Sequence, residues 1–156
     1  MAMNRCRARS VLHRSPCRRL GYCRFLFGAI IPRYFMSRPL ELPRVLFVDD
    51  SEVMREVWSL MLSPLGFDIV LAQSGKHALH LARSRLPDVV ITDMVMPEMT
   101  GIDLFNALLA DSILCVVPVI FLTSGTFPDS RPRRDHWLNK DVAPGLLAGK
   151  IRSLLV

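Results

Sequence analysis

From residue 44 onward, short apolar runs alternate with longer amphipathic segments. Runs of four to seven apolar residues are typical of buried strands, and the longer segments place apolar side chains at helical spacing. Strands are predicted at residues 45–48, 68–72, 89–92, 116–122 and 136–139. Because strands alternate with helices and contain few polar residues, the pattern predicts an α/β fold with a doubly wound, five-stranded parallel sheet.

The helices between these strands have recognisable ends and inner faces. Ser51 offers a hydroxyl cap for the first helix, which Gly66 ends, and Thr100 with Asp103 forms a capping box for the third. The first helix is expected to bury Val53, Val57, Leu60 and Met61. The inner faces of the second, third and last helices are expected to contain Ala78, Leu81, Ala82, Leu104, Leu108, Leu147, Ile151 and Leu154.

The connection between the fourth and fifth strands is unusually short. Only 11 residues separate Gly125 from Trp137, and Pro128 and Pro132 interrupt them. Parallel crossovers generally need a dozen or more residues, and proline breaks a helix interior. The helix at this point is therefore predicted to be truncated or absent.

Charge divides the chain into a basic extension, residues 1–43, and a body, residues 44–156. The extension holds nine arginines and one glutamate, a net charge of +8, whereas the body has 11 basic and 13 acidic residues, a net charge of −2. Four prolines and the absence of a lasting apolar face predict a disordered extension. Its longest apolar stretch, residues 25–31, is too short to span a membrane.

Several interpretations of the extension remain open. It is upstream sequence with Met36 as the natural start, a transit peptide, or a basic arm for nucleic acid or anionic lipid. A secretory signal fits least well, because no small-residue cleavage pattern follows the apolar stretch. In the body, Cys115 is the only cysteine, so neither a disulfide framework nor paired cysteine ligands are expected, which suits a cytoplasmic protein.

The candidate chemistry of the body lies at the carboxyl ends of the predicted strands, where doubly wound sheets bind their ligands. Asp49, Asp50, Asp93, Thr123 and Lys140 all fall there. Three neighbouring carboxylates repel each other unless a cation joins them, and all-oxygen ligands suit Mg²⁺. The hydroxyl and the ammonium would suit a phosphoryl group, which makes Asp93 the candidate nucleophile.

These segments resemble the receiver domain of two-component response regulators, typified by the single-domain chemotaxis regulator. The resemblance covers residues 44–156, through the acidic pair after the first strand, the segment around Asp93 with Gly101, and the segments ending in Thr123 and Lys140. It implies a flavodoxin-like sheet in the order 2-1-3-4-5. It also implies a signalling phosphoacceptor, not an enzyme beyond its own phosphorylation and dephosphorylation.

The resemblance also implies a role for each site residue. Asp93 would accept phosphate from a sensor histidine kinase or a phosphotransfer protein. Mg²⁺ would be held by Asp50, Asp93 and the Val95 carbonyl, with Asp49 acting through water. Thr123 and Lys140 would bind the phosphoryl oxygens, and Trp137 would rotate inward on activation. Val95 and Gly125, two residues beyond Asp93 and Thr123, would flank the reacting phosphorus.

One departure from the family pattern affects Lys140. Asp141 follows it where the family usually has proline, and a cis peptide bond there would cost about 2.5–4 kcal/mol. We therefore expect either a trans bond with a displaced Lys140 or a strained loop.

The output of the protein is predicted to depend on a downstream partner that the sequence does not identify, because the chain ends soon after the last expected core residue. No nucleic acid is expected to bind the body. The alternative is a degenerate receiver that acts as a phosphorylation-independent interaction module. A haloacid-dehalogenase-like phosphatase is disfavoured, because Asp49-Asp50-Ser51 does not supply the Asp-x-Asp pair which that class needs.

Overall fold

A single parallel sheet organises the protein. The structure, a computed structural model, describes residues 41–125 and 135–155. Its five strands lie in the order β2-β1-β3-β4-β5, which confirms the predicted topology. The strands are β1 Arg44–Val48, β2 Asp68–Ala72, β3 Val89–Asp93, β4 Val119–Thr123 and β5 Asp135–Asn139.

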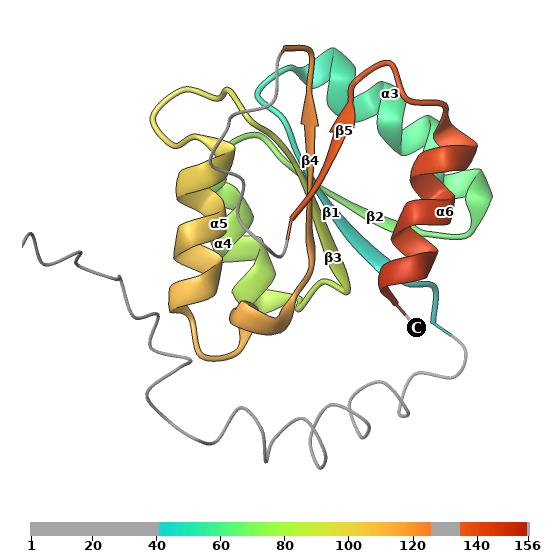
Figure 1. The fold of residues 1–156 in the computed structure, drawn as a ribbon. Coiled ribbons are helices and arrows are strands. Elements are labelled where there is room, and N and C mark those ends of the chain that lie inside the picture. Colours follow the sequence, from blue (N-terminus) through green and yellow to red (C-terminus); the bar gives the residue numbers. More distant parts are fainter. Residues whose placement is uncertain (1–40, 126–134, 156) are drawn as a thin grey trace, which may run out of the picture.

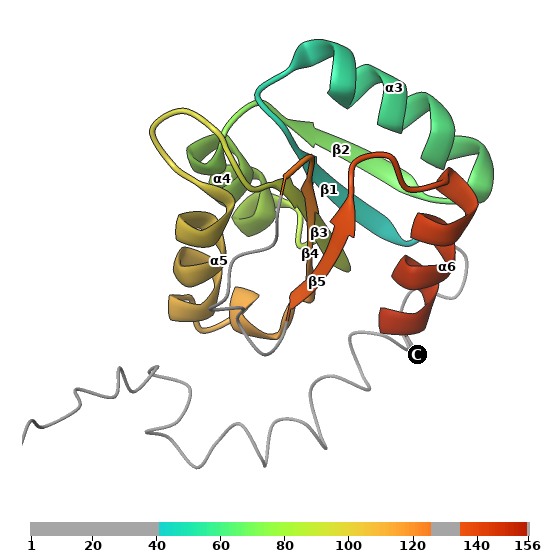
Figure 2. The same cartoon turned by 45° about the horizontal axis from the view of Figure 1, so that its top comes forward.

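Two pairs of helices cover the two faces of this sheet (Figure 1). α4 and α5 lie on one face, and α3 and α6 lie on the other, as the turned view also shows (Figure 2). Their bounds are α3 Glu52–Leu62, α4 Gly75–Ser84, α5 Gly101–Ala110 and α6 Pro144–Leu154. Short 3-10 turns follow α3 and α5, at η2 Ser63–Leu65 and η3 Leu114–Val116.

Each face of the sheet has its own hydrophobic core. Leu46 and Val90 point into the core beneath α4 and α5, whereas Phe47 and Ile91 point into the core beneath α3 and α6. Successive residues of a strand alternate between the two faces, so burial on both sides requires nearly continuous apolar strands. This explains why the strands read as unbroken apolar runs in the sequence.

The buried face of α3 differs from the predicted one. Val53, Leu60 and Met61 are 67%, 76% and 44% exposed, whereas Trp58 and Leu62 are buried. Trp58 and Leu62 are also four residues apart, so the helix has two apolar stripes at helical spacing. The stripe with the indole packs inward, where Trp58 contacts Phe47 with ring centroids 6.2 Å apart. Trp58 and Leu62 join the core beneath α3 and α6, and Val57 of the predicted stripe is partly buried.

The predicted start of the fourth strand is wrong. Val116 belongs to the 3-10 turn η3, and β4 begins only at Val119. Proline has no N–H to donate to a sheet, so Pro118 marks the boundary and only its carbonyl joins the ladder, accepting from Val90 N–H at 2.9 Å. An apolar run that contains two kinds of element cannot be divided by hydrophobicity alone.

The predicted inner faces of the other helices are confirmed. The inner faces of α4, α5 and α6 bury Ala78, Ala82, Leu104, Leu108, Leu147 and Ile151, and Leu81 and Leu154 pack partly buried against the same cores. Thr100 and Asp103 form the expected capping box at the start of α5. The predicted end of the first helix at Gly66 is wrong: α3 ends at Leu62, and Gly66 ends the following turn η2 in the left-handed conformation with φ of 88°, which favours glycine.

The connection between β4 and β5 has eleven residues, 124–134, of which the structure describes two. This is shorter than the crossover that usually carries a complete helix between parallel strands. The predicted truncated helix therefore falls on residues 126–134, outside the described residues. None of the helices in residues 41–125 and 135–155 has the length and apolar character needed to cross a bilayer.

Candidate functional site

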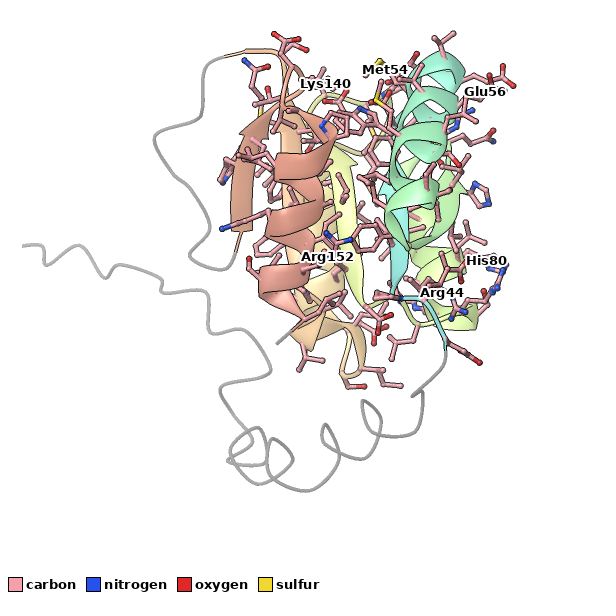
Figure 3. The ribbon with its side chains drawn as sticks, turned by 90° about the vertical axis from the view of Figure 1, so that its right-hand side faces the viewer. Arg44, Met54, Glu56, His80, Lys140 and Arg152 are labelled. Atoms are coloured by element: carbon pink, nitrogen blue, oxygen red, sulfur yellow. The ribbon has the colours of Figure 1, made fainter. Side chains whose placement is uncertain are left out.

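The loops that follow β1, β3, β4 and β5 meet at one end of the sheet, the top of the molecule in Figure 1. Parallel strands all end at the same edge, so residues far apart in sequence gather there. Figure 3 shows Lys140 at the same end as Met54, near the start of α3, and Arg44 and Arg152 toward the opposite end. Contacts described below bring Asp49, Asp50, Asp93, Thr123 and Lys140 together at this end of the sheet.

The turn from β1 into α3 presents two carboxylates with different surroundings. Asp49 is buried, at 1% exposed, and its two oxygens accept from the Ser51 N–H at 2.9 Å and from Lys140 Nζ at 2.9 Å. Asp50 is exposed, and no hydrogen bond to its carboxylate occurs among the described residues. Ser51 caps α3, as predicted, by accepting from the Met54 N–H at 3.4 Å. Asp49 is therefore held by protein groups, and Asp50 is free for a ligand.

Asp93 ends β3 beside the acidic pair. Its Oδ1 accepts from the Met94 N–H at 2.7 Å, and its Oδ2 lies 2.8 Å from Lys140 Nζ. The first residue of α5 is pressed against this strand end, because the Gly101 N–H donates to the Met94 carbonyl at 3.0 Å. The glycine thus allows α5 to begin directly against the backbone that carries Asp93.

The Lys140 ammonium lies between the carboxylates of Asp49 and Asp93, and the Lys140 side chain is only 16% exposed. Burial lowers the pKa of its ammonium, but the hydrogen bonds and charges of Asp93 and Asp49 outweigh burial and raise that pKa above the ordinary 10.5. The ammonium therefore links the ends of β1 and β3 through its ion pairs with Asp49 and Asp93.

The raised pKa of Lys140 predicts a loss of stability at alkaline pH. A group whose pKa is higher in the folded than in the unfolded chain contributes stability that is complete below the unfolded value, about 10.5, and is lost as the pH rises through the folded value. Urea unfolding at a series of pH values from about 9 to about 12 measures this loss. The free energy of unfolding should fall more steeply for the wild type than for Lys140→Met; parallel curves would contradict the prediction.

Thr123 ends β4 next to Lys140. Its side chain is buried, its hydroxyl oxygen accepts from the Gly125 N–H at 3.2 Å, and its carbonyl accepts from the Lys140 N–H at 3.0 Å. A hydroxyl that accepts one bond still has a hydrogen to donate. The two residues predicted to bind phosphoryl oxygens are thus joined through the backbone.

The peptide bond after Lys140 is trans, as are all peptide bonds of the described residues. The sequence led us to expect that a trans bond would displace Lys140 or that the loop would be strained. Instead Lys140 reaches both carboxylates, and Glu98 is the only non-glycine residue with positive φ in the described part of the chain. Asp141 is therefore accommodated without backbone strain in this turn.

The three carboxylates fit a hard divalent cation. Asp49, Asp50 and Asp93 each offer an oxygen, and these oxygens lie within 4.8 Å of one another. Lys140 is the only basic side chain that pairs with this group among the described residues, which leaves an excess of negative charge. Carboxylate oxygens with an open, solvated side are typical Mg²⁺ ligands. The donor set and the unpaired Asp50 thus suit Mg²⁺.

Trp137 lies on β5, opposite Phe121 of β4 and two residues before Asn139, which pairs with Thr123. It stacks on Phe121 with ring centroids 4.3 Å apart and planes inclined by 11°, and it packs against the core beneath α4 and α5. Phe121 and Thr123 are two residues apart on β4 and so face the same side of the sheet. The aromatic pair therefore lies on the same side of the sheet as the Thr123 side chain.

The two residues predicted to flank the reacting phosphorus are both exposed. The side chain of Val95 is 69% exposed on the loop after β3, and Gly125 is exposed after β4. Neither side chain has a polar atom. Neither position therefore offers a side chain that could hydrogen-bond to a water molecule.

Sequence reasoning missed one basic residue that contacts the site. Arg55 Nη1 donates to the carbonyl oxygens of Asp49 at 2.8 Å and Asp50 at 3.0 Å, which fastens the acidic turn to α3. A basic residue one turn after the Ser51 cap was a sequence signal for this contact. It also missed Lys76 and Glu98, whose ion pair of 2.8 Å ties the start of α4 to the loop after β3.

The chain is similar in sequence to known proteins. The family model for the response regulator receiver domain matches residues 45–132. Two-component response regulator ORR3 of Oryza sativa subsp. indica is 41% identical over 109 residues, which cover 65% of this chain and 82% of that protein. DNA-binding response regulator MtrA of Mycolicibacterium smegmatis is 39% identical over 117 residues, which cover 72% of this chain and 50% of MtrA. The chain spans about half the length of the first curated relatives that it matches.

Solved structures agree with this assignment. The chemotaxis protein CheY4 of Vibrio cholerae superimposes with a TM-score of 0.68 at 31% identity, covering 73% of this chain and 99% of CheY4. The receiver domain of the hybrid histidine kinase CckA gives a TM-score of 0.61 at 27% identity, covering 72% of this chain and 99% of that domain. Together with the strand order and the residues at the strand ends, these matches show that the chain belongs to the response regulator receiver domain family.

Proposed function

We propose that this protein is a phosphoaccepting response regulator in which Asp93 takes the phosphoryl group. The observation that carries the proposal is the placement of Lys140, which lies 2.8 Å from Asp93 and 2.9 Å from Asp49. A cation held at the nucleophile can neutralise the charge of an incoming phosphoryl group without rearrangement of the fold. A degenerate receiver would have no need to keep this set of groups together.

In the proposed reaction an Asp93 carboxylate oxygen attacks the phosphorus of the donor. The bond from phosphorus to the donor nitrogen or oxygen breaks, an Asp93 acyl phosphate forms, and the donor leaves with the bonding electron pair. Lys140 and the Thr123 hydroxyl would then bind phosphoryl oxygens. Mg²⁺, held by Asp50, Asp93 and the Val95 carbonyl with Asp49 acting through water, would neutralise the remaining charge.

The proposed donor is a sensor histidine kinase or a phosphotransfer protein, and residues 44–156 form the proposed receiver unit. The signal would leave through a downstream protein, with Trp137 as the residue whose rotation reports phosphorylation. The Phe121 stack places Trp137 on the side of the sheet that Thr123 faces, so a movement of Thr123 toward the phosphoryl group would alter its surroundings.

Acetyl phosphate, a small phosphodonor, tests the proposal without a kinase. Intact mass spectrometry of the protein after incubation with acetyl phosphate and Mg²⁺ should show one added phosphoryl group. The same incubation with a chelator in place of Mg²⁺ should show none. Failure to label with Mg²⁺ would reject the phosphoacceptor function and favour the phosphorylation-independent interaction module.

Mg²⁺ affinity is expected to depend more on Asp50 than on Asp49. Asp50 is exposed and unpaired, whereas both oxygens of Asp49 are already bound by Ser51 and Lys140. Asp50→Ala should weaken Mg²⁺ binding at least about tenfold more than Asp49→Ala does. The measurement is a Mg²⁺ titration followed by tryptophan fluorescence, with Glu56→Ala, an exposed carboxylate on α3, as the charge-matched control. Equal weakening by the two aspartate variants would refute the ordering.

The phosphorylated state is expected to decay slowly. Hydrolysis needs a water in line with the Asp93 oxygen–phosphorus bond, and neither Val95 nor Gly125 can hydrogen-bond to such a water through its side chain. Val95→Asn should accelerate decay about tenfold, equivalent to about 1.4 kcal/mol of barrier. Decay is followed by mass after the donor is removed; an unchanged or slower rate in Val95→Asn would show that Val95 does not control access of water.

A further inference from the structure

The turn that leads from β5 into α6 is built on the side chain and carbonyl of one residue, Asn139. Its Oδ1 accepts from the Asp141 N–H at 3.1 Å, and its carbonyl oxygen accepts from the Val142 N–H at 3.0 Å. The first bond is an Asx turn and the second closes a β-turn over the same residues. Lys140, between them, therefore has both flanking peptide groups fixed.

The backbone N–H of Lys140 is fixed as well. Its own N–H donates to the Thr123 carbonyl at 3.0 Å, the last bond of the β4–β5 ladder. Beyond this bond the side chain must direct its ammonium to Asp49 and Asp93, at 2.9 Å and 2.8 Å. A lysine side chain has many rotamers, so its reach is productive only from a backbone that points the right way.

The residue after Lys140 determines which backbone hydrogen bonds this turn must satisfy. Asp141 has an N–H that a proline would lack, and this N–H needs a partner within the turn. Asn139 supplies that partner. Since Glu98 is the only non-glycine residue with positive φ in the described ranges, Lys140 and Asp141 both have negative φ.

The geometry points to Asn139 as a positioning residue for Lys140: its side chain closes the turn that aims the ammonium at Asp49 and Asp93. Asn139 does not itself touch a reacting atom. Its effect on phosphorylation rests on the function proposed above, whereas its effect on the placement of Lys140 holds in the metal-free protein.

Labelling by acetyl phosphate and Mg²⁺ tests the consequence for the reaction. Asn139→Ala should label about tenfold more slowly than the wild type, because a small misplacement of a reacting group costs rate. Asn139→Asp keeps an acceptor oxygen at the same position and should stay within about twofold of the wild type. Asn106→Ala, an exposed asparagine on α5, is the control and should label at the wild-type rate. A wild-type rate in Asn139→Ala, or failure of Asn139→Asp to restore the rate, would overturn the inference.

A double-mutant cycle tests the positioning without metal or phosphate. Urea unfolding is measured for the wild type, Asn139→Ala, Lys140→Met and the double variant. If Asn139 aims Lys140, the two substitutions are not additive, and Lys140→Met changes stability less when Asn139 is already alanine. Additive changes would overturn the inference.

The two experiments separate this inference from the proposed function. If the wild type labels but Asn139→Ala labels equally well and the cycle is additive, only the role of Asn139 is rejected. If the wild type does not label, the proposed function fails, and the cycle alone still decides whether Asn139 positions Lys140.

Discussion

Asp93→Asn should take up no phosphoryl group from acetyl phosphate and Mg²⁺ under conditions that label the wild type fully. The amide keeps the shape of the side chain, and its oxygen can still accept from the Met94 N–H, which donates to Asp93 at 2.7 Å. It is not a nucleophile of comparable strength, and it cannot form the acyl phosphate. The variant therefore removes the reaction while leaving the strand end largely intact.

The control for this variant is Asp141→Asn, which changes an exposed carboxylate close to the site and should label like the wild type. Urea unfolding of both variants establishes that each is folded. A phosphoryl mass on folded Asp93→Asn would show that another residue is the acceptor.

Gly101→Ala is expected to have the largest effect on the structure around the site. A Cβ at this position would collide with the Asp93 carbonyl oxygen and lie 3.1 Å from Met94 Cα, and neither is the end of a flexible side chain. α5 would have to move away from the strand end that carries Asp93. We expect a loss of about 1–3 kcal/mol in the free energy of unfolding, as for overpacked sites, together with slower labelling.

Gly149→Ala in α6 is the matched control. A Cβ there meets no atom within 4 Å. In an exposed helix interior, alanine is more stable than glycine by about 0.5–1 kcal/mol. Urea unfolding should therefore show opposite changes for the two substitutions. Equal stability of Gly101→Ala and the wild type would mean that α5 does not depend on the close approach at Gly101.

The fold and the polar residues of the site were predictable because both follow from local patterns. Unbroken apolar runs ending in Asp49, Asp93 and Thr123 indicate buried parallel strands, and parallel strands bring their ends together. The hydrophobic pattern was not sufficient where two solutions compete. In α3 Val53 and Leu60, seven residues apart, and Trp58 and Leu62, four residues apart, both lie at helical spacing, yet only the second pair is buried, with Trp58 against Phe47.

The supporting contacts of the site were less accessible to sequence reasoning. Arg55 reaches the Asp49 and Asp50 carbonyls through a long side chain, and many rotamers of such a side chain point elsewhere. The expected displacement of Lys140 was wrong, because Asn139 closes the turn with its side chain and accommodates Asp141 in place of proline. Both contacts join side chain to backbone, and periodicity carries no information about such bonds.

Chemical trapping identifies the residue that carries the phosphoryl group. The wild type is incubated with acetyl phosphate and Mg²⁺, the acyl phosphate is reduced with borohydride, and the modified residue is located by peptide mass spectrometry. Reduction of an aspartyl phosphate yields homoserine in its place. We expect homoserine at position 93 and nowhere else; homoserine at position 49 or 50, or no reduced residue at all, would contradict the assignment of Asp93 as the phosphoacceptor.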